Sequence, residues 1–263
     1  EVLLTEPYVR GRIPVVFVHG TASSPARWAE VLNELHADGR VSCWGFNAQG
    51  QLGNGTTTAS SVPVPVTGIT NATALAANAF HSCAVLADGR VECWGGNNYG
   101  QLGNGTSLQS NVPVAVTGLT DATDLAVGYY HSCAIVGGGG AACWGQGGYG
   151  QLGDGVRPSF ALVPVAVSGI TDATALIAGD RHTCAILGNG DMSCWGSNWF
   201  GQLGNGTNDE SIAPIAVPGI TGVTDLAAGT GQRRPRQLLL FALAFVAVAA
   251  LVTVPLLPDG GFR

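Results

Sequence analysis

One stretch of the chain, residues 72–120, reads ATALAANAFHSCAVLADGRVECWGGNNYGQLGNGTSLQSNVPVAVTGLT and returns nearly intact twice more. Two landmarks measure the spacing of the copies. The triplet Cys-Trp-Gly begins at positions 43, 93, 143 and 194, and Gln-Leu-Gly-(Asn/Asp)-Gly begins at 51, 101, 151 and 202, so both advance by 50, 50 and 51 residues. A repeat of about fifty residues is typical of a propeller or a solenoid.

Each copy has the pattern of short β-strands. The apolar-rich runs 83–86 and 90–94 are joined through Asp88-Gly89, a strong hairpin signal because both residues tolerate a positive φ. Pro113 lies in the alternating run 112–116 and has no N–H to donate, so we expect this strand at a sheet edge. With a fourth apolar run at 122–127, the pattern predicts an all-β fold built from four-stranded propeller blades.

At this point the residues resemble a known family. His81-Ser-Cys-Ala84, Asp88-Gly-Arg-Val-Glu-Cys-Trp-Gly95 and Asn98-Tyr-Gly-Gln-Leu-Gly-Asn-Gly-Thr106 are similar to the bacterial form of the regulator-of-chromosome-condensation repeat. The resemblance spans residues 36–229 and implies a β-propeller, commonly of seven blades. This chain has three full copies, a leading half-copy over 36–70 and a trailing strand over 223–229. We therefore expect a partial or open propeller.

The charge and the loops bear on the partner. All eleven basic residues are Arg, and residues 36–229 carry twelve acids against four Arg, a net charge of −8. This balance argues against a nucleic-acid partner, which would call for a basic face. No residue outside the structural motif carries over nucleotide exchange. The loops that differ between copies, at 57–61, 108–111, 156–161 and 208–212, suit recognition of a protein partner. We predict a non-catalytic binding or scaffolding module without a cofactor.

Six of the seven cysteines fall in pairs ten residues apart, on either side of a predicted hairpin turn: Cys83 and Cys93, Cys133 and Cys143, Cys184 and Cys194. Disulfides are one interpretation, and they imply an oxidising compartment; buried free thiols are the other. Zinc is disfavoured because CxxC spacing is absent. Cys43 faces Asn33 at the partner position, so we expect it to be a free thiol. The recurring His81, His131 and His182 suit a structural hydrogen-bonding role rather than a metal site.

Residues 12–35 differ in character from the repeats, whereas residues 1–11 carry no clear signal. An apolar run at 13–18 predicts a buried strand, His19-Gly20-Thr21 a turn, and the spacing of Trp28, Val31, Leu32 and Leu35 a helix. Strand, turn and helix together resemble the oxyanion-loop region of α/β-hydrolases of the lipase and esterase type. That resemblance implies an oxyanion-hole role for His19, Gly20 and Thr21.

No Gly-x-Ser-x-Gly nucleophile motif occurs in the chain, so we do not expect an enzyme. A hydrolase remnant without its nucleophile is one alternative function. A second is an artefactual fusion with no function as a unit, since the helix would join the repeats abruptly at residue 36.

Residues 230–263 form the third predicted segment. Three Arg precede residues 238–257, twenty residues without charge, which are long enough to span a bilayer as a helix. Arg before the span favours a cytoplasmic position for that end, whereas disulfides would place the repeats outside the cytoplasm. We expect a membrane-associated protein with extracytoplasmic repeats, divided into segments 1–35, 36–229 and 230–263.

Overall fold

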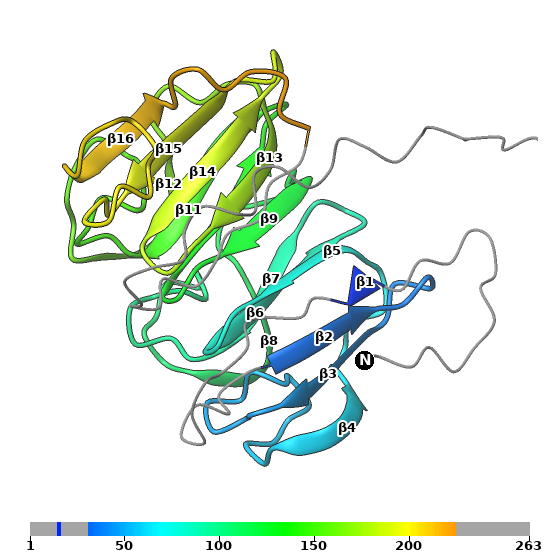
Figure 1. Ribbon diagram of the computed structural model, residues 1–263. Helices are drawn as coiled ribbons and strands as arrows, with labels where there is room; N and C mark the ends of the chain where they lie inside the picture. The colour runs from blue at the N-terminus through cyan, green and yellow to red at the C-terminus, as the bar shows by residue number, and fades with distance from the viewer. Residues whose placement is uncertain (1–14, 17–30, 225–263) are drawn as a thin grey trace, which may run out of the picture. The chain divides into compact units, whose positions relative to one another are not determined.

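The computed structural model of the protein describes residues 15–16 and 31–224, which form four separate four-stranded antiparallel sheets taken in chain order (Figure 1). In each sheet the strands follow one another in sequence. The first sheet holds β1 (Val15–Val16), β2 (Val31–Leu35), β3 (Val41–Gly45) and β4 (Ser60–Pro65); the second β5 (Ala72–Ala77), β6 (His81–Leu86), β7 (Val91–Gly95) and β8 (Ser110–Ala115); the third β9 (Asp124–Val127), β10 (His131–Val136), β11 (Gly140–Gln146) and β12 (Phe160–Ala166); the fourth β13 (Ala173–Ala178), β14 (His182–Leu187), β15 (Met192–Gly196) and β16 (Ser211–Ala216). The prediction of four-stranded blades is confirmed.

The local signals act as expected. Asp88-Gly89 closes the β6–β7 hairpin, with Gly89 at φ +79° and the Asp88 carboxylate accepting a hydrogen bond of 3.1 Å from the Arg90 N–H. Pro113 lies on β8, which is an edge strand of its sheet. An edge strand leaves one row of backbone groups unpaired, so a residue without an N–H costs no ladder hydrogen bond there.

The N-terminal prediction needs correction. The helix expected through Val31, Leu32 and Leu35 is wrong, because residues 31–35 form strand β2, which pairs with β3. Its register sets Asn33 opposite Cys43, as Cys83 is set opposite Cys93 in the second sheet. A short apolar run fits both helical and strand spacing, and the hydrogen bonds offered by β3 decide for the strand.

The first unit is therefore a four-stranded sheet rather than half a blade. Strand β1 covers Val15–Val16 of the predicted run 13–18, and it pairs antiparallel with β2 instead of joining a parallel α/β sheet. His19, Gly20 and Thr21 lie outside the described residues, as does the predicted span 238–257. Among the residues that the structure describes, no helix has the length and apolar character needed to cross a membrane.

Each sheet packs one face against the next. We call the face that carries the cysteine pair the front, and the face that carries the Trp of Cys-Trp-Gly the back. Three apolar clusters each combine the front of one sheet with the back of its successor. They are represented by Cys43 with Trp94, Cys93 with Trp144, and Cys143 with Trp195. Since all six of these side chains are 0% exposed, the joins between sheets form the core of the protein.

Candidate interaction surface

The repeated polar residues are used at the joins between sheets. The backbone carbonyl of Gln101 accepts hydrogen bonds from the Trp144 indole at 2.9 Å and from the Ser132 hydroxyl at 3.0 Å. The carbonyls of Gln51 and Gln151 do the same for the second and fourth sheets. The Gln-Leu-Gly loop of each of the first three sheets thus binds the next sheet, and these carbonyls are not available for a ligand.

The repeated histidines have a structural role as well. His81 Nε2 lies 2.8 Å from the Ser132 hydroxyl, and His131 Nε2 lies 2.9 Å from the Thr183 hydroxyl, both across a join. Burial lowers the pKa of His81 and of His131 to about 3, so both rings are neutral at pH 7. No group of three or more His, Cys, Asp or Glu within the described part of the chain is arranged to hold a metal ion.

The paired cysteines lie directly opposite each other on neighbouring strands. All three pairs lie at disulfide distance, with their Cα atoms 4.0–4.1 Å apart. Cys43 is a buried free thiol opposite the buried Asn33, and burial raises its pKa above the usual range of a thiol. A protonated, enclosed thiol is a poor nucleophile, so Cys43 offers no reactive site.

A band of aromatic rings lies at one end of the sheets. Phe80 stacks on Tyr130 at 5.1 Å between ring centroids and meets Tyr129 edge-on at 4.8 Å. Tyr99 contacts Tyr130 at 4.8 Å, so rings of the second and third sheets form one cluster. All four side chains are only partly buried. We define the aromatic band as Phe80, Tyr99, Tyr129, Tyr130, Tyr149, Arg181 and Trp199.

Arg181 continues the band onto the fourth sheet. Its guanidinium lies 4.5 Å from the centroid of Tyr149 and 5.8 Å from that of Trp199, and these two rings meet edge-on at 5.3 Å. Burial raises the pKa of the Tyr130 hydroxyl, and the positive charge of Arg181 opposes this shift. The other described Arg residues pair with carboxylates, whereas Arg181 makes no salt bridge within the described ranges.

The variable loops lie at the same end as the band. His81 pairs with Gly95, and Gly95 pairs with Ser110, so β6 begins, β7 ends and β8 begins at one end of the sheet. Phe80 and Tyr99 flank these strand ends, and loop 106–109 leads into β8 from the same side. Loop residues here are strongly exposed: Leu108 by 74%, Phe200 by 72% and Trp199 by 51%.

The variable loops were predicted from the sequence, whereas the aromatic band was not. A signal was present, since Phe80, Tyr130 and Arg181 directly precede the repeated His, and an aromatic residue lies two before the repeated Gln in three of the four copies. Aromatic residues and Arg181 occupy most of these positions. What could not be read from the sequence is that the two sets meet, because their contacts run between loops of neighbouring sheets.

Comparison with known proteins identifies the repeat. Models of the "Regulator of chromosome condensation (RCC1) repeat" match residues 38–85, 88–135 and 139–186, and a second model of that description matches 72–101, 122–151 and 176–202. A curated relative, the E3 ubiquitin-protein ligase HERC2 of Homo sapiens and Mus musculus, is 32% identical over 59 residues, which are 22% of this chain and 1% of that protein.

Solved structures agree on the fold. Human WBSCR16 is 28% identical with a TM-score of 0.65, over 72% of this chain and 50% of that one. Yeast RCC1 (Prp20), in a structure with Kap60, is 19% identical with a TM-score of 0.65, over 80% of this chain and 50% of that one. The chain spans about half the length of these structures. The bacterial type of repeat and the hydrolase-like segment find no support among these matches. Since the first set of matched repeats covers more than half of its residues, the chain belongs to the regulator of chromosome condensation (RCC1) repeat family.

Proposed function

We propose that this chain is a non-catalytic protein-binding module, and that the partner binds where the aromatic band and the variable loops share one end of the sheets. The single observation that carries the proposal is the Tyr149–Arg181–Trp199 stack beside the Phe80 cluster. Tyr, Trp and Arg are the residues that most often dominate binding energy at protein interfaces. The stack holds their side chains in place before a partner arrives, which reduces the entropy lost on binding.

The charge of Arg181 indicates which kind of protein would bind the aromatic band. Residues 36–229 have a net charge of −8, yet Arg181 lies over the Tyr149 ring of the band and forms no salt bridge among the described residues. A carboxylate of the partner could bind the edge of the Arg181 guanidinium, while apolar side chains of the same partner cover the aromatic rings of the band. The proposed partner is therefore a protein that presents an acidic residue among apolar ones. Yeast Prp20, which shares the fold, is described with Kap60 and with binding to Gsp1p and histones, a precedent for protein ligands.

The test places a photo-crosslinking amino acid at Trp199 in the full chain and, as a matched control, at the exposed Asn189 in the turn at the opposite end of the fourth sheet. Crosslinked proteins are identified by mass spectrometry, and binding of the purified candidate is then titrated. We expect crosslinking from Trp199 alone, and at least about tenfold weaker binding for Arg181→Ala and Tyr130→Ala, each a loss of about 1.4 kcal/mol. Equal crosslinking from Asn189, or unchanged binding in both variants, contradicts the proposal.

We also propose that the repeats face an oxidising compartment and that residues 238–257 tether them to a membrane. The support is the three cysteine pairs at disulfide distance and the uncharged twenty-residue run. Alkaline carbonate extraction of cells that express the full chain tests the tether, and deletion of residues 238–257 is the control. Release of the full chain into the soluble fraction would reject it.

A further inference from the structure

The aromatic band carries hydrogen-bond donors that have no acceptor among the described residues. Four of them are the side-chain hydroxyls of Tyr99, Tyr129, Tyr130 and Tyr149, which belong to partly buried residues. None of these oxygens is among the enclosed polar atoms that lack a partner, so the hydroxyls reach solvent. Trp199 is 51% exposed, and its indole N–H likewise meets no acceptor in the described part of the chain. The band therefore offers a set of free donors at its surface.

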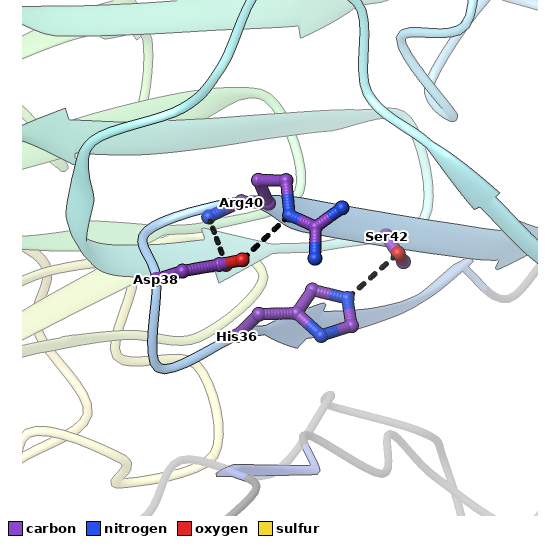
Figure 2. A network of polar contacts seen from close by, with 4 residues as sticks. All are labelled: His36, Asp38, Arg40 and Ser42. Atoms are coloured by element: carbon purple, nitrogen blue, oxygen red, sulfur yellow. Dashed lines mark hydrogen bonds and ion pairs between the residues drawn. The ribbon is translucent and has the colours of Figure 1, made fainter.

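Polar side chains at a hairpin turn provide a contrast. At the β2–β3 hairpin, the Arg40 guanidinium donates to the Asp38 carboxylate at 2.7 Å (Figure 2). The Ser42 hydroxyl lies 2.8 Å from His36 Nε2 in the same network. These groups satisfy one another within a single hairpin, so they gain little from a ligand. The donors of the band have no such partners and gain hydrogen bonds only from solvent or from a ligand.

The band has few hydrogen-bond acceptors. No Asp or Glu belongs to it, and its phenol oxygens are its only side-chain acceptors. Asp180 directly precedes Arg181 in the chain, but its Oδ1 is buried and does not reach the surface. Arg181 adds a permanent positive charge with further N–H donors. A ligand that complements the band must therefore supply acceptors and needs few donors of its own.

A proline-rich segment has this combination of groups. Proline has a backbone carbonyl but no N–H, so it brings an acceptor without a donor. In the polyproline II helix the carbonyls make no internal hydrogen bonds and remain open to a partner. The helix is already extended before it binds, so less conformational entropy is lost on binding. Aromatic surfaces bind proline-rich segments in several recognition domains for these reasons.

The angles between the rings suit proline better than a flat ligand. Tyr129 and Tyr130 lie at 76° to each other, and Tyr149 and Trp199 lie at 90°. Perpendicular rings form a stepped surface, on which a flat aromatic ligand would stack on one ring at a time. The rigid ring of proline is compact, and successive prolines of the helix project in three directions. Proline rings can therefore pack against several rings of the stepped surface together.

We infer that the aromatic band binds a proline-rich segment in the polyproline II conformation, flanked by an acidic residue. The tyrosine hydroxyls donate to the carbonyls of the segment, and its proline rings pack on the aromatic rings. The acidic residue pairs with Arg181, the one described Arg that forms no salt bridge within the described ranges. This assignment rests on the proposed function, because it names the part of the protein partner that occupies the band.

The test is fluorescence polarisation of the full chain with a labelled oligoproline peptide that ends in two glutamates. A control peptide of the same length and charge has alternating Gly and Ser in place of the prolines, which makes it flexible. We expect saturable binding of the proline peptide. Binding of the control peptide should be at least about fivefold weaker, because it loses the preformed helix and the proline rings.

Variants of the chain test the individual contacts. Tyr130→Phe and Tyr149→Phe keep the ring and remove only a hydroxyl, so each should weaken binding of the proline peptide about fivefold, the equivalent of one hydrogen bond. Arg181→Ala should weaken it at least about tenfold, because a hydrogen bond to a charged group is lost. The matched control is Arg40→Ala, whose guanidinium already pairs with Asp38 and which should leave binding unchanged.

Three outcomes overturn the inference. They are no saturable binding of the proline peptide, equal binding of the Gly-Ser peptide, and unchanged binding in both Phe variants when circular dichroism shows them to be folded. Each of these leaves the proposed function standing if a photo-crosslinker at Trp199 still captures a protein. A captured protein whose crosslinked segment lacks proline also rejects the inference alone, whereas equal crosslinking from Asn189 rejects the proposed function.

Discussion

Replacing Trp144 by Phe tests whether the joins between sheets hold the array together. The Trp144 side chain is 0% exposed, packs on Gly103 and donates to the Gln101 carbonyl at 2.9 Å. Phe fills most of the same space but has no N–H and a smaller ring. The matched control is Trp44→Phe, because Trp44 lies at the equivalent position of the first sheet, is partly exposed, and its indole donates to no other described residue.

Three contributions set the magnitude for Trp144. The lost hydrogen bond costs about 1 kcal/mol net, because the Gln101 carbonyl keeps the Ser132 hydroxyl at 3.0 Å and is not left unsatisfied. Two lost ring carbons cost about 1.6 kcal/mol in transfer free energy. A residual cavity of roughly 30 Å³ costs about 0.7 kcal/mol. Together the substitution should lower the free energy of unfolding by about 3 kcal/mol.

Urea denaturation followed by far-ultraviolet circular dichroism measures this difference, with the slope against urea used to check that both variants unfold in the same manner. Trp44→Phe should cost less than about 1 kcal/mol, because its indole donates to no other described residue and its partly exposed ring leaves no enclosed cavity. If the two substitutions cost the same within about 0.5 kcal/mol, the sheets are not coupled through the Trp–Gln contact, and the reasoning fails.

Three further predictions follow from burial and pairing. Without reductant, alkylation of the denatured chain should modify Cys43 alone, as counted by intact mass. Modification of all seven cysteines would show that the three disulfides are not formed. Acid should destabilise the fold, because the pKa of His131 is about 3 in the folded state and 6.5 in the unfolded state. The neutral ring therefore contributes its full stability above pH 6.5, and this contribution is lost as the pH falls toward 3. The melting temperature should consequently fall less between pH 7 and pH 4 in His131→Gln than in the unaltered chain. Ala134→Glu, which buries an unpaired charge, should cost at least about 3 kcal/mol in urea denaturation. Glu34→Ala, at the equivalent but partly exposed position of the first sheet, should cost almost nothing, and equal costs for the two substitutions would contradict this difference in burial.

Several features of the fold follow from local sequence. The period, the Asp88-Gly89 turn, the edge position of Pro113 and the ten-residue spacing of the cysteines each depend on a few neighbouring residues. A hairpin with a defined turn fixes which residues face each other, so Cys83 and Cys93 had to be opposite once that turn was read correctly.

Strand β2 shows where the sequence was not sufficient. Residues 31–35 lie outside the clear repeats, and their apolar spacing suits a helix as well as a strand. Pairing with β3 decides between them, because the edge of β3 supplies hydrogen bonds that an isolated helix of this length could not match. The same pairing places Glu34 at the register position that the buried alanines occupy in the other sheets.

By itself, the sequence determined the repeat, the strand order within a blade, the candidate cysteine pairs and the negative charge that disfavours nucleic acid. Only the tertiary structure decided that aromatic side chains from neighbouring sheets meet at Arg181, and that Gln carbonyls accept hydrogen bonds from the Trp of the next sheet. The physical reason is sequence separation. Contacts between residues about fifty positions apart depend on how whole sheets pack, and no local pattern of side chains encodes that packing.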